Sequence, residues 1–129
     1  MKIKTNSIKT KVKINNNLND TIVSSIQDIK GKKIILMDLR KIDEAPTDYF
    51  IICEGDSTTQ IKAISDSIQK KVFEELQIKP NHREGLTESK WVLVDYFNTI
   101  VHVFYPETRK YYDLEDLWSD SKFEYFEDM

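Results

Sequence analysis

The sequence is poor in the residues that mark disulfide-rich, Gly/Pro-rich and membrane-spanning proteins. Its 129 residues include one cysteine, three glycines and three prolines, which excludes an internal disulfide and argues against a low-complexity chain. No apolar run approaches the roughly 20 residues needed to cross a bilayer, and the first residues lack the apolar stretch of a signal peptide. We therefore expect a cytoplasmic protein without a membrane segment.

The spacings typical of metal and nucleotide sites are also missing. The two histidines, His82 and His102, stand twenty residues apart, and the sequence contains neither an H-x-x-x-H nor a C-x-x-C motif. A Walker loop and a G-x-S-x-G elbow are likewise absent. Cys53 lies in an apolar run without a neighbouring His or Lys, which favours a buried small hydrophobe over a reactive thiol. We expect no catalytic residues, no bound metal and no cofactor.

What is present suffices for one domain. The chain is 40% hydrophobic and 32% charged, with a formal net charge of -3, as expected of a globular protein with a solvated surface. The first fourteen residues carry five lysines and no acid, whereas the last seventeen carry seven acidic residues and one lysine. We therefore divide the chain into a flexible basic arm (residues 1–14), a domain (15–118) and an acidic tail (119–129), and we interpret both ends as solvated segments.

Apolar periodicity predicts two helices and two strands in the first eighty residues. A helix is expected over about residues 18–29, where apolar residues recur at helical spacing. Two short apolar runs, at residues 33–39 and 49–53, are typical of buried strands. A second helix is expected to begin at Ser57–Gln60, which has the form of a capping box, and to end before Pro80.

The second half of the sequence predicts a hairpin and a short helix. The apolar runs at residues 91–96 and 100–105 are separated by three turn residues, which favours antiparallel pairing. After Pro106, a helix over residues 113–118 should have Leu114, Leu117 and Trp118 on its apolar face. The succession of helices and strands indicates a single α/β domain with a mixed β-sheet flanked by helices.

Alternation along the hairpin divides its side chains between the two sides of the sheet. Trp91, Leu93 and Asp95 should point to one side, and Tyr96 to the other with the intervening valines. Residue types alone leave two interpretations open: Trp91 and Asp95 contact a partner, or Trp91 fills the core and Asp95 caps a turn. An isolated strand histidine such as His102 is more often a hydrogen-bonded structural residue than a catalyst.

An ordered set of motifs runs along the chain: Asp38, Asp48–Phe50, Gly55–Ser57, Arg83–Gly85, Trp91–Tyr96, Val101–Phe104 and Tyr112–Trp118. Together they resemble the RsfS/Iojap (DUF143) family of ribosomal silencing factors. The resemblance extends over about residues 18–118, and the order of the motifs makes it specific, since none of them suffices alone. Arg83 stands where many members carry valine.

The resemblance implies a nucleotidyltransferase-like fold, a homodimer and a function that requires no catalysis. It implies binding to large-subunit ribosomal protein uL14, at the face where the small subunit docks, so that subunit joining is blocked sterically and translation is repressed. Direct contact with ribosomal RNA is not predicted. The segment at residues 107–112 either extends the ribosome-facing surface or is a solvated connection. The candidate partner-binding residues are Trp91, Leu93, Asp95, Tyr96, His102, Phe104 and Arg109.

The alternative is a nucleotide-binding or nucleotidyl-transferring enzyme. A glycine turn between a strand and a helix, as at Gly55–Ser57, can bind phosphate through exposed amides. Nucleotidyl transfer also requires paired carboxylates that hold metal ions, and the strand after that helix offers only the single Asp95. We therefore favour the binding protein over the enzyme.

Overall fold

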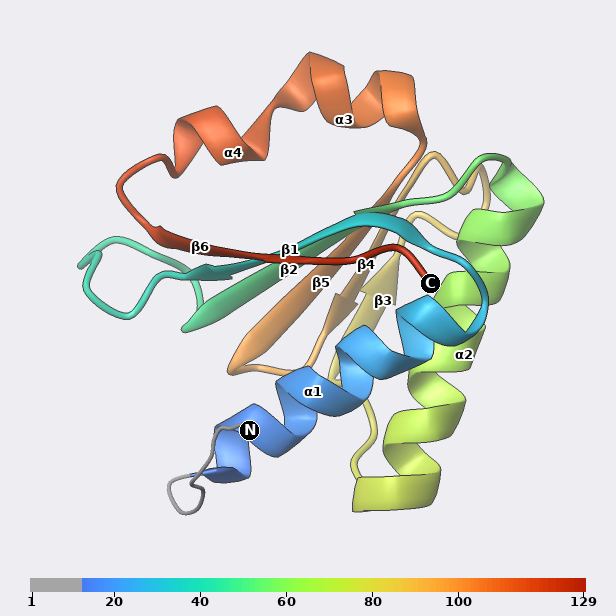
Figure 1. Ribbon diagram of the computed structural model, residues 1–129, viewed down its shortest axis with the longest axis horizontal. Helices are drawn as coiled ribbons and strands as arrows, with labels where there is room; N and C mark the ends of the chain where they lie inside the picture. The colour runs from blue at the N-terminus through green and yellow to red at the C-terminus, as the bar shows by residue number, and fades with distance from the viewer. Residues whose placement is uncertain (1–12) are drawn as a thin grey trace.

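Six strands form one mixed sheet in the computed structural model, which describes residues 13–129 (Figure 1). Their order is β3-β4-β5-β2-β1-β6, and all neighbours are antiparallel except β2 and β5, which are parallel. The predicted α/β domain with a mixed sheet is thereby confirmed. The elements in chain order are α1 (Lys13–Asp28), β1 (Lys32–Asp38), β2 (Tyr49–Glu54), α2 (Thr58–Leu76), β3 (His82–Glu84), β4 (Trp91–Asp95), β5 (Thr99–Phe104), α3 (Pro106–Tyr112), α4 (Leu114–Leu117) and β6 (Lys122–Phe126).

Helices α1 and α2 cover one face of the sheet, which we call the first face (Figure 1). The predicted cap of α2 is confirmed, because the Ser57 hydroxyl accepts a hydrogen bond from the Gln60 amide at 3.1 Å. The Gln60 side chain accepts from the amide of Asp56, one residue earlier than a capping box requires. Apolar residues of α1 and α2 pack against the inward side chains of β1, β2, β4 and β5 and form the larger of two core clusters.

The predicted hairpin is confirmed as β4 and β5. The two strands pair antiparallel, with Trp91 opposite Phe104 and Leu93 opposite His102. The Tyr96 amide donates to the Thr99 carbonyl at 2.8 Å and closes the turn. Side chains of β4 alternate between buried and partly exposed, because one side of the strand faces α2 and the other faces away from it.

Helices α3 and α4 lie over the opposite face, the second face (Figure 1). The segment after Pro106 is helix α3, an element that was not predicted from the sequence. Pro106 occupies its first turn, where the missing N–H costs no hydrogen bond. Helix α4 is confirmed, and the Asp113 side chain caps it. Its apolar face differs from the prediction, because Leu114 is buried whereas Leu117 is 69% exposed.

Two strands were not predicted. Strand β6 lies within residues 119–129, the predicted acidic tail, and pairs antiparallel with β1 along its whole length. Strand β3 lies between the predicted second helix and the predicted hairpin, where no element was expected. Helix α1 starts at Lys13, so the described structure includes the last residues of the predicted basic arm; residues 1–12 lie outside the described part. No helix within residues 13–129 is long and apolar enough to cross a membrane.

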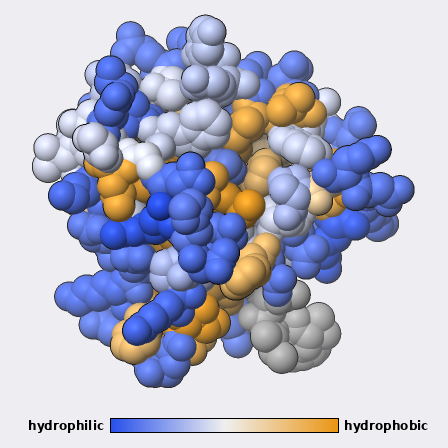
Figure 2. Space-filling model, turned by 180° about the vertical axis from the view of Figure 1, so that it is seen from behind, coloured by the Kyte–Doolittle hydropathy of each residue, from blue (hydrophilic) through white to orange (hydrophobic). Residues whose placement is uncertain are grey.

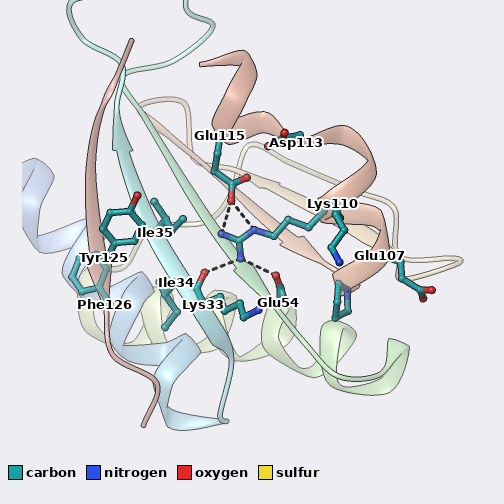
Figure 3. A pocket seen from close by; sticks show the side chains of 12 residues that line it. Lys33, Ile34, Ile35, Glu54, Glu107, Lys110, Asp113, Glu115, Tyr125 and Phe126 are labelled. Atoms are coloured by element: carbon teal, nitrogen blue, oxygen red, sulfur yellow. Dashed lines mark hydrogen bonds and ion pairs between the residues drawn. The ribbon is translucent and has the colours of Figure 1, made fainter. Parts of the chain in front are cut away.

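A buried ion cluster around Arg109 fixes α3 and α4 to the second face (Figure 3). The Arg109 guanidinium donates to the Lys33 carbonyl of β1 at 2.8 Å, to Glu54 of β2 at 3.2 Å and to Glu115 of α4 at 3.0 Å. Its side chain is 7% exposed. The cluster forms one wall of a cavity of about 580 Å³ between α3 and strands β1 and β6. The carboxylates Glu54 and Glu115 are thus already paired within the fold.

We expect Arg109→Met to lower the free energy of unfolding by about 3 kcal/mol, because two largely buried carboxylates lose their common cation. Urea denaturation at pH 7 measures the change. Arg40→Met is the matched control, since Arg40 pairs with Asp38 at the surface and its loss should cost about 1 kcal/mol or less. Equal losses for the two variants would show that the Arg109 cluster does not hold α3 and α4 in place.

Candidate functional site

Part of the second face remains open where β4 and β5 extend beyond α3 and α4. Trp91, Leu93 and Asp95 of β4 and Ile100 of β5 are partly exposed there. The same strands are closed on the first face, where Val92, Val94, Val101 and Val103 are fully buried. We call the open region, with the neighbouring side chains of α3, the aromatic surface. It is the candidate functional site because partly exposed apolar side chains gather on it.

Trp91 is the centre of the aromatic surface. Its ring stacks on Phe104 at a centroid distance of 5.0 Å and packs at 4.7 Å against Tyr112 of α3. Its indole N–H donates to Nδ1 of His102 at 3.1 Å. Trp91 is therefore partly a core residue and partly a surface residue, and the two interpretations that the sequence left open describe its two sides.

His102 lies beneath Trp91 and is 4% exposed. Burial lowers the pKa of His102 to about 3, so the imidazole is neutral at physiological pH. Because Nδ1 accepts the indole hydrogen bond, the ring proton sits on Nε2. The ring also packs edge-to-face against Phe50 at 4.5 Å. His102 thus supports Trp91 and does not itself reach the surface.

Asp95 ends β4 and caps the hairpin turn. Its Oδ1 accepts a hydrogen bond of 2.7 Å from the Phe97 amide. Phe97 has a φ of 71°, a conformation that non-glycine residues rarely adopt, so this bond helps to hold the strained turn. Asp95 therefore has the turn-capping role that the sequence allowed, while its partial exposure leaves it on the edge of the aromatic surface beside Leu93.

The structure places five of the seven candidate residues in or directly beneath the aromatic surface and places Tyr96 and Arg109 elsewhere. Phe104 is fully buried and forms the floor under Trp91. Tyr96 is 5% exposed and packs into the core of the first face, where burial raises the pKa of its hydroxyl to about 12. Arg109 is 6% exposed and occupied by the ion cluster. Tyr96 and Arg109 therefore contribute to packing and not to the exposed part of the site.

Two exposed aromatic side chains of α3 were not among the seven candidate residues, although the sequence left open that residues 107–112 extend the surface. Tyr112 is 50% exposed and contacts Trp91, and Tyr111 is 81% exposed and packs edge-to-face on Tyr112 at 5.0 Å. Proline after a strand is a known sign of a helix start and could have revealed α3.

Seen from behind, the molecule shows hydrophobic residues in small patches among hydrophilic ones (Figure 2). Apolar exposure is thus divided between several places on that side.

The residues required by the nucleotide-binding alternative serve other purposes. In the Gly55–Ser57 turn, Asp56 pairs with Lys32 at 3.0 Å, and side chains of Ser57 and Gln60 accept hydrogen bonds from local amides. A Cβ at Gly55 would lie 2.9 Å from Ile61, so glycine permits the close packing of α2 on the strand end. Within residues 13–129, no three His, Cys, Asp or Glu residues gather as a metal site.

Comparison with known proteins identifies the family. Residues 12–128 match the family described as "Ribosomal silencing factor during starvation". The chain is 36% identical over 107 residues to ribosomal silencing factor RsfS of Halalkalibacterium halodurans, covering 83% of this chain and 90% of that protein. It is 38% identical over 99 residues to RsfS of Bacillus subtilis, covering 76% and 81%.

A solved structure shows the same fold. The crystal structure of a Chromobacterium violaceum protein superposes with a TM-score of 0.76 at 36% sequence identity, covering 81% of this chain and 85% of that one. The family match spans nearly the whole chain and the fold agrees with that of a homologous structure. The chain belongs to the RsfS/Iojap family of ribosomal silencing factors, which are regulators and not enzymes.

Proposed function

We propose that this protein is a cytoplasmic silencing factor that binds the large ribosomal subunit through ribosomal protein uL14 and sterically blocks association with the small subunit. The observation that supports this proposal is the aromatic surface on the open part of the second face. Trp91 is anchored there on Phe104 and Tyr112 and remains partly exposed beside Leu93. A prepositioned tryptophan with apolar neighbours is a preferred anchor in protein interfaces.

Steric blocking requires affinity for one surface and no turnover. A protein bound where the small subunit docks prevents joining for as long as it remains bound, and its effect follows its concentration relative to its Kd. A preformed surface favours such binding, because side chains that are already ordered lose little entropy on association. The packing of Trp91 between Phe104 and Tyr112, together with its bond to His102, supplies that order.

We expect the purified protein to co-sediment with isolated large subunits and to lower the yield of joined ribosomes in sucrose gradients. Trp91→Ala should weaken binding about thirtyfold, because truncation of a central interface tryptophan commonly costs about 2 kcal/mol. Leu93→Asp should weaken binding to a similar extent, because it places an unpaired carboxylate in the interface.

The control is Phe73→Ala, which removes an aromatic side chain that is 43% exposed on α2, away from the aromatic surface. It should bind and block joining like the parent. Melting temperatures of all variants separate lost binding from lost folding. Normal binding by both Trp91→Ala and Leu93→Asp would refute the assignment of the surface, and unchanged joining with the parent protein would refute the proposed function.

The support of Trp91 by a neutral histidine makes stability depend on pH. Burial lowers the pKa of His102 from 6.5 to about 3, so below pH 6.5 the unfolded chain takes up a proton that the folded protein does not. Between pH 7 and pH 5 this difference should lower the free energy of unfolding by about 2 kcal/mol. His102→Gln lacks the titrating group. The gap in free energy of unfolding between the parent and this variant should therefore change by about 2 kcal/mol between pH 7 and pH 5. A gap that is constant with pH would contradict the buried neutral histidine.

We further propose a homodimer in the free state. The proposal rests on the family resemblance, and no residue pattern in the chain specifies the interface. Light scattering at micromolar concentration should report twice the mass of one chain, and concentration-dependent dissociation should appear on dilution. A single-chain mass at every concentration up to about 100 µM would contradict the dimer.

A further inference from the structure

A hollow of about 600 Å³ opens beside Trp91, between the segment that leads into β4 and one side of α3. Three aromatic rings line it: Trp91, Tyr111 and Tyr112. The rings are adjacent, with centroid distances of 4.7 Å from Trp91 to Tyr112 and 5.0 Å from Tyr112 to Tyr111. Aromatic rings have electron-rich faces that attract positive charge.

Two carboxylates line the same hollow. Glu88 comes from the segment before β4, and Glu107 lies one helical turn before Tyr111 on α3. Both are exposed, and neither has an ion-pair partner among residues 13–129. Within the same residues, the cations found over aromatic rings lie at Tyr49 and Phe73, away from this hollow.

Rings and carboxylates together attract a cation. The face of an aromatic ring attracts a cation within about 6 Å of its centre, and the attraction grows when water is excluded. Carboxylates add charge-assisted hydrogen bonds to an ammonium or guanidinium group. Lys90 also lines the hollow, so its lining carries two negative charges and one positive charge. The net charge of the lining favours an entering cation.

We propose that this hollow is the subsite of the aromatic surface that receives a lysine or arginine side chain of the ribosomal protein partner. The inference rests on the proposed function and adds to it the chemistry of the partner residue. Trp91 then serves both parts of the interface, since its ring belongs to the apolar contact and also to the wall of the hollow. Tyr111, which is 81% exposed, gains a role that core packing does not give it.

Affinity for large subunits, measured by co-sedimentation with the full chain, tests the subsite. Tyr111→Phe should bind within about twofold of the parent, because phenylalanine keeps a ring face, whereas Tyr111→Leu should bind about tenfold more weakly. The double variant Glu88→Gln and Glu107→Gln should lose about tenfold, and Lys90→Gln should gain about threefold. Equal affinities of the Phe and Leu variants, or parental affinity of the double variant, would overturn the proposal.

A second measurement needs no ribosome. Arginine amide with an acetylated α-amino group, added to the free protein at about 1 to 50 mM, should shift the NMR signal of the Trp91 indole N–H. Citrulline amide with the same acetyl group, which carries no charge, should not. Tyr111→Leu should abolish the shift. If the parent fails to sediment with large subunits but arginine amide still shifts the Trp91 signal, the proposed function is refuted and the cation site is supported. No shift with arginine amide, or equal shifts with both compounds, would refute the site.

Discussion

The arrangement of the second face depends on the buried guanidinium of Arg109. This side chain binds a carbonyl of β1, a carboxylate of β2 and a carboxylate of α4, so it joins elements that are far apart in the sequence. A buried cation is stable only where acceptors and opposite charges surround it, and α3 is therefore held where these groups meet. Tyr112 lies three residues further along α3. Its contact with Trp91, and the hollow beside that contact, follow from the position of the helix.

The two faces of the sheet are covered unequally because their helices differ in length. Helices α1 and α2 have 16 and 19 residues, whereas α3 and α4 have seven and four. At a rise of about 1.5 Å per residue, the two short helices extend only about 10 and 6 Å. Six strands at a spacing of about 4.8 Å make a sheet about 24 Å wide. Part of β4 and β5 therefore stays open, and this is where the partner is proposed to bind.

Strand alternation was enough to predict the sidedness of the site. It placed Trp91, Leu93 and Asp95 on one side and Tyr96 on the other, and the structure agrees. The burial of each side chain could not be predicted in this way, because a period of two distinguishes the faces of a strand but does not say what covers them. His102 and Trp91 share a face, yet only one of them reaches the surface, since Trp91 itself lies over the imidazole.

The sequence by itself determined the class of fold, both long helices, the hairpin and the cap at Ser57, because each depends on residues close together in the chain. Its ordered motifs also indicated the family, which homologous sequences confirm. Only the tertiary structure decided that residues 122–126 form an edge strand, that Arg109 is buried and that Tyr111 and Tyr112 stand beside Trp91. These outcomes depend mainly on partners about 20 to 90 residues away, and a local pattern carries no information about which distant group will pair with a buried charge or with a strand edge.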